Sequence, residues 1–417
     1  MASGGPGPPY QQAWRFVPKD DVVSAPVFAS DAVIAVGKKA VYAIDPSSGE
    51  PLWTIDRAGG AVSAPALVGS AGPLLYVDQP AGEGRPALVA VDPSTRKERW
   101  RVSLQATSRS GIAVAGTMAY LGDEDGHVYA VRVSDGTIAW TASVPGGVAS
   151  APTVSGQTVV VGVRDADAQR PRLVALDAAT GDRRWTYAPA SSGGAPSSTT
   201  IGGDLVYAGF PDRAVRALTI DGGRVDWSSL SLSLFSPVAG PALEAAGGSS
   251  AVYASDVAGG VYRFDGASGE RSWDHQLNAL VVRGSPVLVG DRVLLGLGDG
   301  RLVALEAASG DLVWQSVASP GLLGGIAVSG DVVVAVKGGA RAGLIAWTHD
   351  PSGHLVDVVT PTRVDPAGLV GRFAAALVIV LIVLAVPFRA LRPRIDLAPQ
   401  TPTALDDDET RDNGDAS

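Results

Sequence analysis

A glycine in a turn, followed four residues later by a tryptophan, recurs at nearly constant spacing along this chain. Six copies keep both residues: Gly49 with Trp53, Gly136 with Trp140, Gly181 with Trp185, Gly223 with Trp227, Gly269 with Trp273, and Gly310 with Trp314. Each copy also holds Val/Leu-rich runs of strand length separated by Gly-containing turns, as in residues 284–318. A supersecondary unit repeated every ~40–47 residues is typical of a ring or array, so the repeat constrains the fold more than any other feature.

Two further copies are irregular. One has Arg96 in the turn before Trp100, and the last has Asp357 where the tryptophan would stand after Ser352-Gly353. The tryptophan missing from the last copy is supplied by Trp14, which precedes the first complete copy. The sequence therefore predicts an all-β, eight-bladed propeller of four-stranded antiparallel blades over residues 13–359, in which residues 13–17 form the outer strand of the eighth blade.

The repeat also assigns residues to positions within a blade. We expect small residues on the third strand, Ala43 and Ala90 among them, to allow close packing against aromatic wedges. The wedges are the outer-strand tryptophans. They are Trp14, Trp53, Trp100, Trp140, Trp185, Trp227, Trp273 and Trp314.

The termini differ in composition from the repeats. Residues 1–12 are a Gly/Pro-rich leader and residues 389–417 an acidic tail, and both are expected to be disordered. A linker, 360–367, precedes residues 368–388, which contain an unbroken apolar run from Phe373 to Phe388. This stretch reaches the ~20 residues that a spanning helix needs, so we expect one transmembrane helix and contact with the lipid bilayer there.

The orientation of this helix is open to two interpretations. Three arginines, at 389, 392 and 394, follow the apolar run, against two, at 363 and 372, before or at its start. The positive-inside rule then places the tail in the cytoplasm and the propeller outside, in a single-pass protein of the cell membrane. No apolar signal segment follows the leader, so a tail-anchored protein with a cytoplasmic propeller is the alternative.

Composition excludes several functions. The net charge is −9 without a basic face, which argues against a nucleic-acid partner. The chain has no cysteine, which excludes disulfides, thiolate metal sites and cysteine nucleophiles. No P-loop, dinucleotide fingerprint or nucleophile elbow is present.

The recurring pattern Ser-x-Pro, Asp-Gly-x-Val/Leu-x-Ala-Leu/Val-Asp, Ser/Thr-Gly-x-x-x-Trp resembles the PQQ-like propeller repeat family over residues 13–359. The resemblance implies one of two functions. Quinoprotein dehydrogenases of the family bind pyrroloquinoline quinone and calcium, and the alcohol dehydrogenase type also carries an adjacent cysteine pair. BamB-like members are non-catalytic scaffolds of outer-membrane protein assembly. Because this chain lacks cysteine and a recognisable set of calcium ligands, it is more similar to the scaffold branch, with no catalytic residue, cofactor or metal. A quinoprotein-like dehydrogenase or a ligand-sensing propeller is the alternative.

Two groups of polar residues are candidate metal sites. Asp123-Glu124-Asp125-Gly126 offers clustered oxygens for calcium, but a hairpin needs such a polar turn without any metal, and we favour the turn. His349 and His354 lack a third ligand, and His127 and His275 are isolated, so no zinc site is expected.

The candidate binding residues are charged and precede the innermost strands. Arg109 and Arg283 stand where other copies have small residues, and Asp20 and Asp21 occupy the same register before the first blade. They are expected either to line the channel mouth and bind a protein or peptide partner, or to form a solvated rim.

The loops favour the same face as these residues. Insertions at 79–86, 165–172 and 337–343 lengthen hairpins between second and third strands, which lie on the face of the blade-to-blade connections. Elaborated loops on a rigid ring are where recognition usually resides, so this face is the predicted partner-binding surface.

Overall fold

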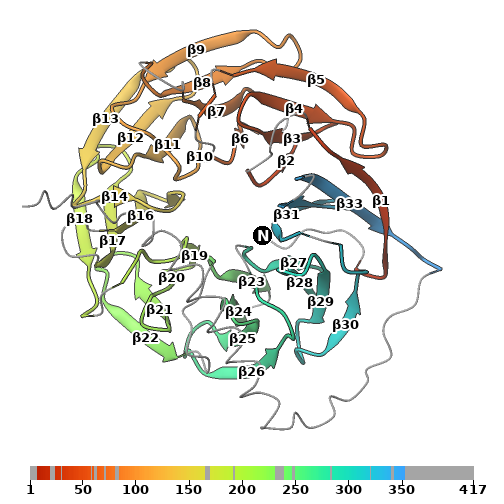
Figure 1. Cartoon of the computed structure of the whole chain (residues 1–417). Coiled ribbons are helices and arrows are strands. Elements are labelled where there is room, and N and C mark those ends of the chain that lie inside the picture. The colour runs from red at the N-terminus through yellow and green to blue at the C-terminus, as the bar shows by residue number, and fades with distance from the viewer. Residues whose placement is uncertain are drawn as a thin grey trace, which may run out of the picture. The chain divides into compact units, whose positions relative to one another are not determined.

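The Gly-Trp repeat folds into a ring of eight antiparallel sheets (Figure 1). The computed structural model describes residues 7–352, apart from 19–23, 30, 58, 61–62, 70–71, 80–83, 165–169, 191–192, 231–238, 247–248, 282–283, 320 and 340–341. All described strands lie within one unit, Met1–Val358. The eight-bladed, all-β propeller predicted from the repeat is confirmed.

Each blade runs from an innermost strand at the centre of the ring to an outermost strand at its rim. Blades 1 to 4 are β2 (Val27–Phe28), β3 (Val33–Val36), β4 (Ala40–Ile44), β5 (Pro51–Asp56); β6 (Ala66–Leu67), β7 (Leu74–Asp78), β8 (Ala87–Val91), β9 (Glu98–Ser103); β10 (Ala113–Ala115), β11 (Met118–Gly122), β12 (His127–Arg132), β13 (Ile138–Ser143); and β15 (Thr153–Ser155), β16 (Thr158–Arg164), β17 (Pro171–Asp177), β18 (Arg183–Tyr187). Blade 4 has a fifth strand, β14 (Gly147–Val148), which pairs with the far end of β16.

Blades 5 to 8 follow the same order. They are β19 (Thr200–Gly202), β20 (Leu205–Gly209), β21 (Ala214–Thr219), β22 (Val225–Leu230); β23 (Ala242–Ala246), β24 (Ser249–Ser255), β25 (Gly260–Asp265), β26 (Arg271–Gln276); β27 (Val287–Val289), β28 (Arg292–Gly296), β29 (Leu302–Glu306), β30 (Leu312–Gln315); and β31 (Leu323–Ser329), β32 (Val332–Lys337), β33 (Gly343–His349), β1 (Tyr10–Phe16).

The first strand of the chain closes the ring, as predicted. β1 pairs antiparallel with β33, and Trp14 lies opposite Ala346. The strand begins at Tyr10, earlier than the predicted residue 13, because Tyr10 is buried edge-on against Trp314 of blade 7. Joining the two ends of the described chain in one sheet leaves no unpaired strand at the closure.

The tryptophans lie in one register. In seven blades the outer-strand tryptophan pairs with an alanine of the third strand, as Trp140 does with Ala130, and in blade 6 Trp273 pairs with Arg263. Six of these rings cover the turn glycine of the next blade: a Cβ added to Gly136 would come within 2.7 Å of Trp100. The ring N–H donates to a carbonyl of that same turn, as from Trp100 to Val133 at 2.8 Å.

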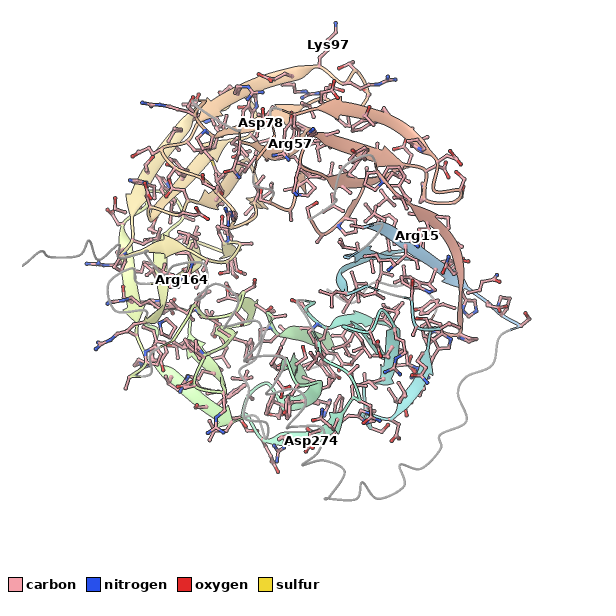
Figure 2. The ribbon with its side chains drawn as sticks, viewed as in Figure 1. Arg15, Arg57, Asp78, Lys97, Arg164 and Asp274 are labelled. Atoms are coloured by element: carbon pink, nitrogen blue, oxygen red, sulfur yellow. The ribbon has the colours of Figure 1, made fainter. Side chains whose placement is uncertain are left out.

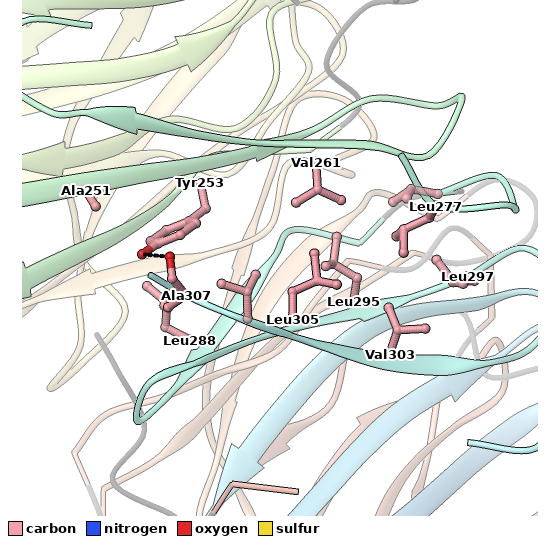
Figure 3. Close-up of a cluster of buried hydrophobic side chains, with 12 residues drawn as sticks. Ala251, Tyr253, Val261, Leu277, Leu288, Leu295, Leu297, Val303, Leu305 and Ala307 are labelled. Carbon is pink, nitrogen blue, oxygen red and sulfur yellow. Dashed lines mark hydrogen bonds between the residues drawn. The ribbon is translucent and has the colours of Figure 1, made fainter. Parts of the chain in front are cut away.

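The apolar core lies between neighbouring blades. Figure 3 shows one such cluster, in which side chains of blade 6 such as Val261 pack against those of blade 7 such as Leu305. At the inner edge, serine hydroxyls supply hydrogen bonds that short innermost strands leave unmade. Ser110 Oγ accepts from the Gly122 N–H at 2.9 Å, and Ser197 does the same for Gly209 at 2.8 Å. The close-packed boundaries between blades and these hydrogen bonds give a rigid frame for the loops.

The predicted membrane helix, 368–388, and the acidic tail lie outside the described residues. Among the residues that the structure does describe, no helix is long and apolar enough to cross a bilayer.

Candidate functional site: the hairpin face

One face of the ring is formed by the hairpins between second and third strands and by the connections between blades. We call it the hairpin face, and the opposite face, with the Gly-Trp turns, the turn face. The long hairpins fall where they were predicted, since β7 ends at Asp78 and β8 begins at Ala87, while β32 ends at Lys337 and β33 begins at Gly343. The elaborated loops therefore share a face with the blade connections.

Of the four predicted binding residues, Arg109 is the one that the structure describes. Its side chain is 64% exposed on the connection between blades 2 and 3. Its Nε lies 3.2 Å from Glu124 Oε1, at the tip of the next hairpin. The prediction overlooked this partner, which makes the local charge balanced rather than positive. Arg283, Asp20 and Asp21 lie outside the described residues, so the charged ring at the channel mouth stays a prediction.

A buried ionic cluster between blades 1 and 2 was missed in the sequence. Arg57 follows β5 at a position where other blades bury Leu104 or Val144, and it is 8% exposed. Its guanidinium donates to the Gly37 carbonyl and, at 2.7 Å, to the Val77 carbonyl, which links the two blades. Figure 2 places Arg57 beside Asp78 at this boundary.

Asp78 is the acidic centre of that cluster. Its Oδ1 lies 3.9 Å from Arg57 Nε, and its Oδ2 accepts a 3.0 Å hydrogen bond from Arg101. Burial opposes the charge on Arg101, but its bonds to Glu98 and Asp78 outweigh this and raise the Arg101 pKa. The signal in the sequence was an aspartate that ends an otherwise apolar strand, LLYVD.

The acidic turn weighed as a calcium site is a self-contained hairpin. Asp123 is fully buried, and its carboxylate accepts the His127 N–H at 2.8 Å and the Tyr129 hydroxyl at 2.7 Å. Blade 6 repeats the arrangement, with Asp256 accepting from Tyr262 at 2.6 Å. Burial and the aspartate raise the pKa of Tyr129, so its hydroxyl remains a donor.

These carboxylates therefore hold their own hairpins. No cluster of three or more His, Cys, Asp or Glu suited to a metal occurs in the described part of the chain. In blade 8, Lys337 lies at the end of the second strand, next to the same hairpin position. It is 1% exposed, and burial lowers its pKa. The hairpins are rigid supports for their exposed tips.

The hairpin face also carries exposed apolar side chains. Large hydrophobic residues on blade connections, or where outer strands end on this face, are exposed by 46–90%. They are Val17, Leu230, Leu280, Val317 and Leu322. Backbone bonds place two of them close together over blades 7 and 8: Gly298 N donates to Leu280 O, and Leu323, next to Leu322, donates to Leu297 O. Exposed large hydrophobic residues that lie near one another on one face are a feature of interaction surfaces.

Known proteins share both the repeat and the ring. The family described as outer membrane protein assembly factor BamB matches residues 84–234 and 230–322, more than half of the chain. The protein of that name from Burkholderia pseudomallei is 29% identical over 53% of this chain and 60% of its own length. The Salmonella typhimurium protein is 28% identical over 62% of this chain and 64% of its own length. The chain thus spans less than two thirds of these relatives.

Solved structures agree on the fold. The crystal structure of BamB from Moraxella catarrhalis superposes with a TM-score of 0.66 at 21% identity, over 81% of this chain and 99% of that one. A quinohemoprotein alcohol dehydrogenase from Pseudomonas putida reaches 0.62 at 13% identity, over 85% of this chain and 78% of the enzyme. The family match and the eight-bladed ring together lead to one conclusion: this chain belongs to the PQQ-like propeller family of the outer membrane protein assembly factor BamB.

Proposed function

We propose that this chain is a non-catalytic scaffold that binds other proteins of the cell envelope through its hairpin face. The observation that carries the proposal is the set of exposed apolar side chains on that face, Leu280, Val317 and Leu322 above all, held on a rigid ring. The names of its relatives, outer membrane protein assembly factors, favour a role in assembling other proteins.

The proposal includes a membrane anchor. Residues 368–388 would hold the propeller at the bilayer, with the propeller outside the cytoplasm and the acidic tail within it. The apolar length of this stretch and the arginines that follow it support this topology.

The interface would combine apolar anchors with a charged rim. Leu280 and Leu322 are exposed by 53% and 46%, so covering them removes apolar surface from water, at roughly 25 cal/mol per Å². Arg109 and Glu124 lie at the same face, and their exposed pair would affect orientation more than affinity.

The test compares apolar residues on the two faces. The full-length protein is extracted in detergent and used to capture partners, followed by the Leu280→Asp/Leu322→Asp variant. Val225→Asp is the matched control, because Val225 is 42% exposed at the turn-face end of β22. We expect the double variant to lose partners that the control retains. Loss with Val225→Asp and retention with the double variant would assign binding to the turn face.

The non-catalytic part is tested separately. Pyrroloquinoline quinone and calcium are added to the purified protein, and dye-coupled oxidation of alcohols and glucose is followed. We expect no turnover above the rate without protein, and a clear rate would favour a dehydrogenase instead.

A further inference from the structure

The boundary between blades 1 and 2 is packed differently from the other boundaries. Its turn has Arg96 where the other described Gly-Trp turns have glycine, and Arg96 keeps the left-handed φ of 62°. A Cβ at this place in the other turns would come within 2.4–2.7 Å of the docked tryptophan. Trp53 therefore cannot dock as its counterparts do. It is half-buried.

A second position of this boundary is occupied by tyrosine in three blades and by an aliphatic residue in the others, and among the described boundaries this one lacks both the tyrosine and the turn glycine. In blades 3, 5 and 6 a tyrosine of the second strand reaches across to the next blade and donates to the same carbonyl as the docked tryptophan. The bonds are Tyr120 to Ala178 (3.1 Å), Tyr207 to Gly266 (3.0 Å) and Tyr253 to Ala307 (3.2 Å). Figure 3 shows the last of these bonds. Ile34 takes this position in blade 1, opposite Ala43, and its aliphatic side chain has no donor for the equivalent carbonyl, that of Pro93.

A pocket of about 250 Å³ lies where that tyrosine ring would be. Ile34, Leu67 and Trp53 supply apolar lining, and Asp31, Asp92 and Ser94 supply polar lining beside Pro93. The volume is below the range of drug-sized sites and suits a single ring. The Asp92 carboxylate beside it already accepts from Ser94, Thr95 and Arg99, so the Pro93 carbonyl is the acceptor that a ligand would meet with a donor.

We infer that this pocket binds a para-substituted phenol, the chemistry of a tyrosine side chain. The ring would fill the space between Trp53 and Ile34, and its hydroxyl would donate to the Pro93 carbonyl, as Tyr253 does to Ala307. An anionic ligand is disfavoured by Asp31 and Asp92. A cationic ligand gains little from Asp92, because Arg99 already pairs with it at 2.5 Å.

The test uses the full-length protein labelled with 5-fluorotryptophan and followed by fluorine NMR. The Trp53 signal is assigned with Trp53→Phe, and p-cresol is titrated against toluene and ethylguanidinium. We expect a saturable shift of the Trp53 signal at roughly millimolar p-cresol, with toluene at least fivefold weaker. Equal binding of toluene, stronger binding of ethylguanidinium, or no saturable shift at Trp53 would each overturn the assignment.

Two variants close the pocket from within. Ile34→Tyr supplies the ring that blades 3, 5 and 6 have, and Arg96→Gly removes the Cβ that keeps Trp53 from docking. Each is expected to weaken p-cresol binding at least tenfold, and unchanged binding in a folded variant would refute the site. If Ile34→Tyr does not fold, Arg96→Gly decides alone, since glycine suits the local φ.

N-acetyltyrosinamide distinguishes the two sources of a phenol. A shift like that of p-cresol would indicate a tyrosine presented by a polypeptide, whereas binding of p-cresol alone would indicate a small phenolic compound. Because these titrations need no partner protein, their failure would leave the proposed scaffold function intact, and loss of partners would leave the pocket intact.

Discussion

Because a tryptophan packs on the turn glycine of the next blade, replacing that glycine with alanine should lower the free energy of unfolding by a specific amount. Gly136 has φ +75°, and its added Cβ would lie 2.7 Å from the ring of Trp100. Gly116 in the same blade has φ +58°, and its added Cβ would meet nothing within 4 Å. Gly136→Ala and Gly116→Ala therefore share the backbone penalty and differ in the contact with tryptophan.

The magnitudes follow from this difference. A left-handed φ costs a non-glycine residue about 1–2 kcal/mol, and the lower entropy of the unfolded chain offsets part of this in both variants. Displacing Trp100 forfeits part of the ~3–5 kcal/mol that removing a buried tryptophan would cost, and it strains the hydrogen bond to Val133. We expect Gly136→Ala to reduce the free energy of unfolding by about 2 kcal/mol more than Gly116→Ala.

Thermal and urea unfolding of both variants measure this difference, which corresponds to a gap of roughly 3 °C in Tm. In a Trp100→Ala background the excess cost of Gly136→Ala should vanish, because no ring remains to be displaced. If the two glycine variants are equally destabilised, or if the excess persists without Trp100, the tryptophan contact is not the reason for the glycine.

Three further predictions concern closure, acid stability and topology. Deleting residues 1–17 should lower Tm markedly, since it exposes the edge of β33 that β1 covers and removes one tryptophan, and an unchanged Tm would refute closure by β1. Hydrogen bonds to Asp45, first from the Ser47 hydroxyl and then from the Ser48 N–H, lower its pKa to about 2. The stabilising effect of Asp45 is therefore complete above about pH 4 and is lost as the pH falls through about 2. Between about pH 4 and about pH 2 the urea midpoint should fall less in Asp45→Ala than in the parent, and equal losses would count against this. Single cysteines at Ser48 and Ser417, treated on intact cells with an impermeant thiol reagent, should be labelled at 48 and protected at 417, whereas the reverse would place the propeller in the cytoplasm.

Features of the candidate site that follow from the order of strands in the sequence could be predicted, whereas features that depend on contacts in space could not. The hairpin face was predictable, because strand order in an antiparallel blade fixes which loops share a face. Arg109 lies on a blade connection, but its pair with Glu124 joins that connection to a hairpin and has no fixed spacing in the sequence. The exposure of Leu280 and Leu322 could not be predicted either, because the sequence pattern around an apolar loop residue does not distinguish a buried side chain from an exposed one.

The sequence by itself determined the fold. A period of ~40–47 residues, turn glycines and one tryptophan per copy leave few alternatives to an eight-bladed ring, and the displaced Trp14 even indicated how the ring closes. Only the tertiary structure decided what happens between blades. Arg57 bridging two blades, Asp78 buried beside it, and the pocket left by Ile34 and Arg96 all depend on side chains about 20 to 60 residues apart in the sequence. The free energies of these contacts depend on how deeply the side chains are buried and how close they come to one another, and a sequence pattern shows neither.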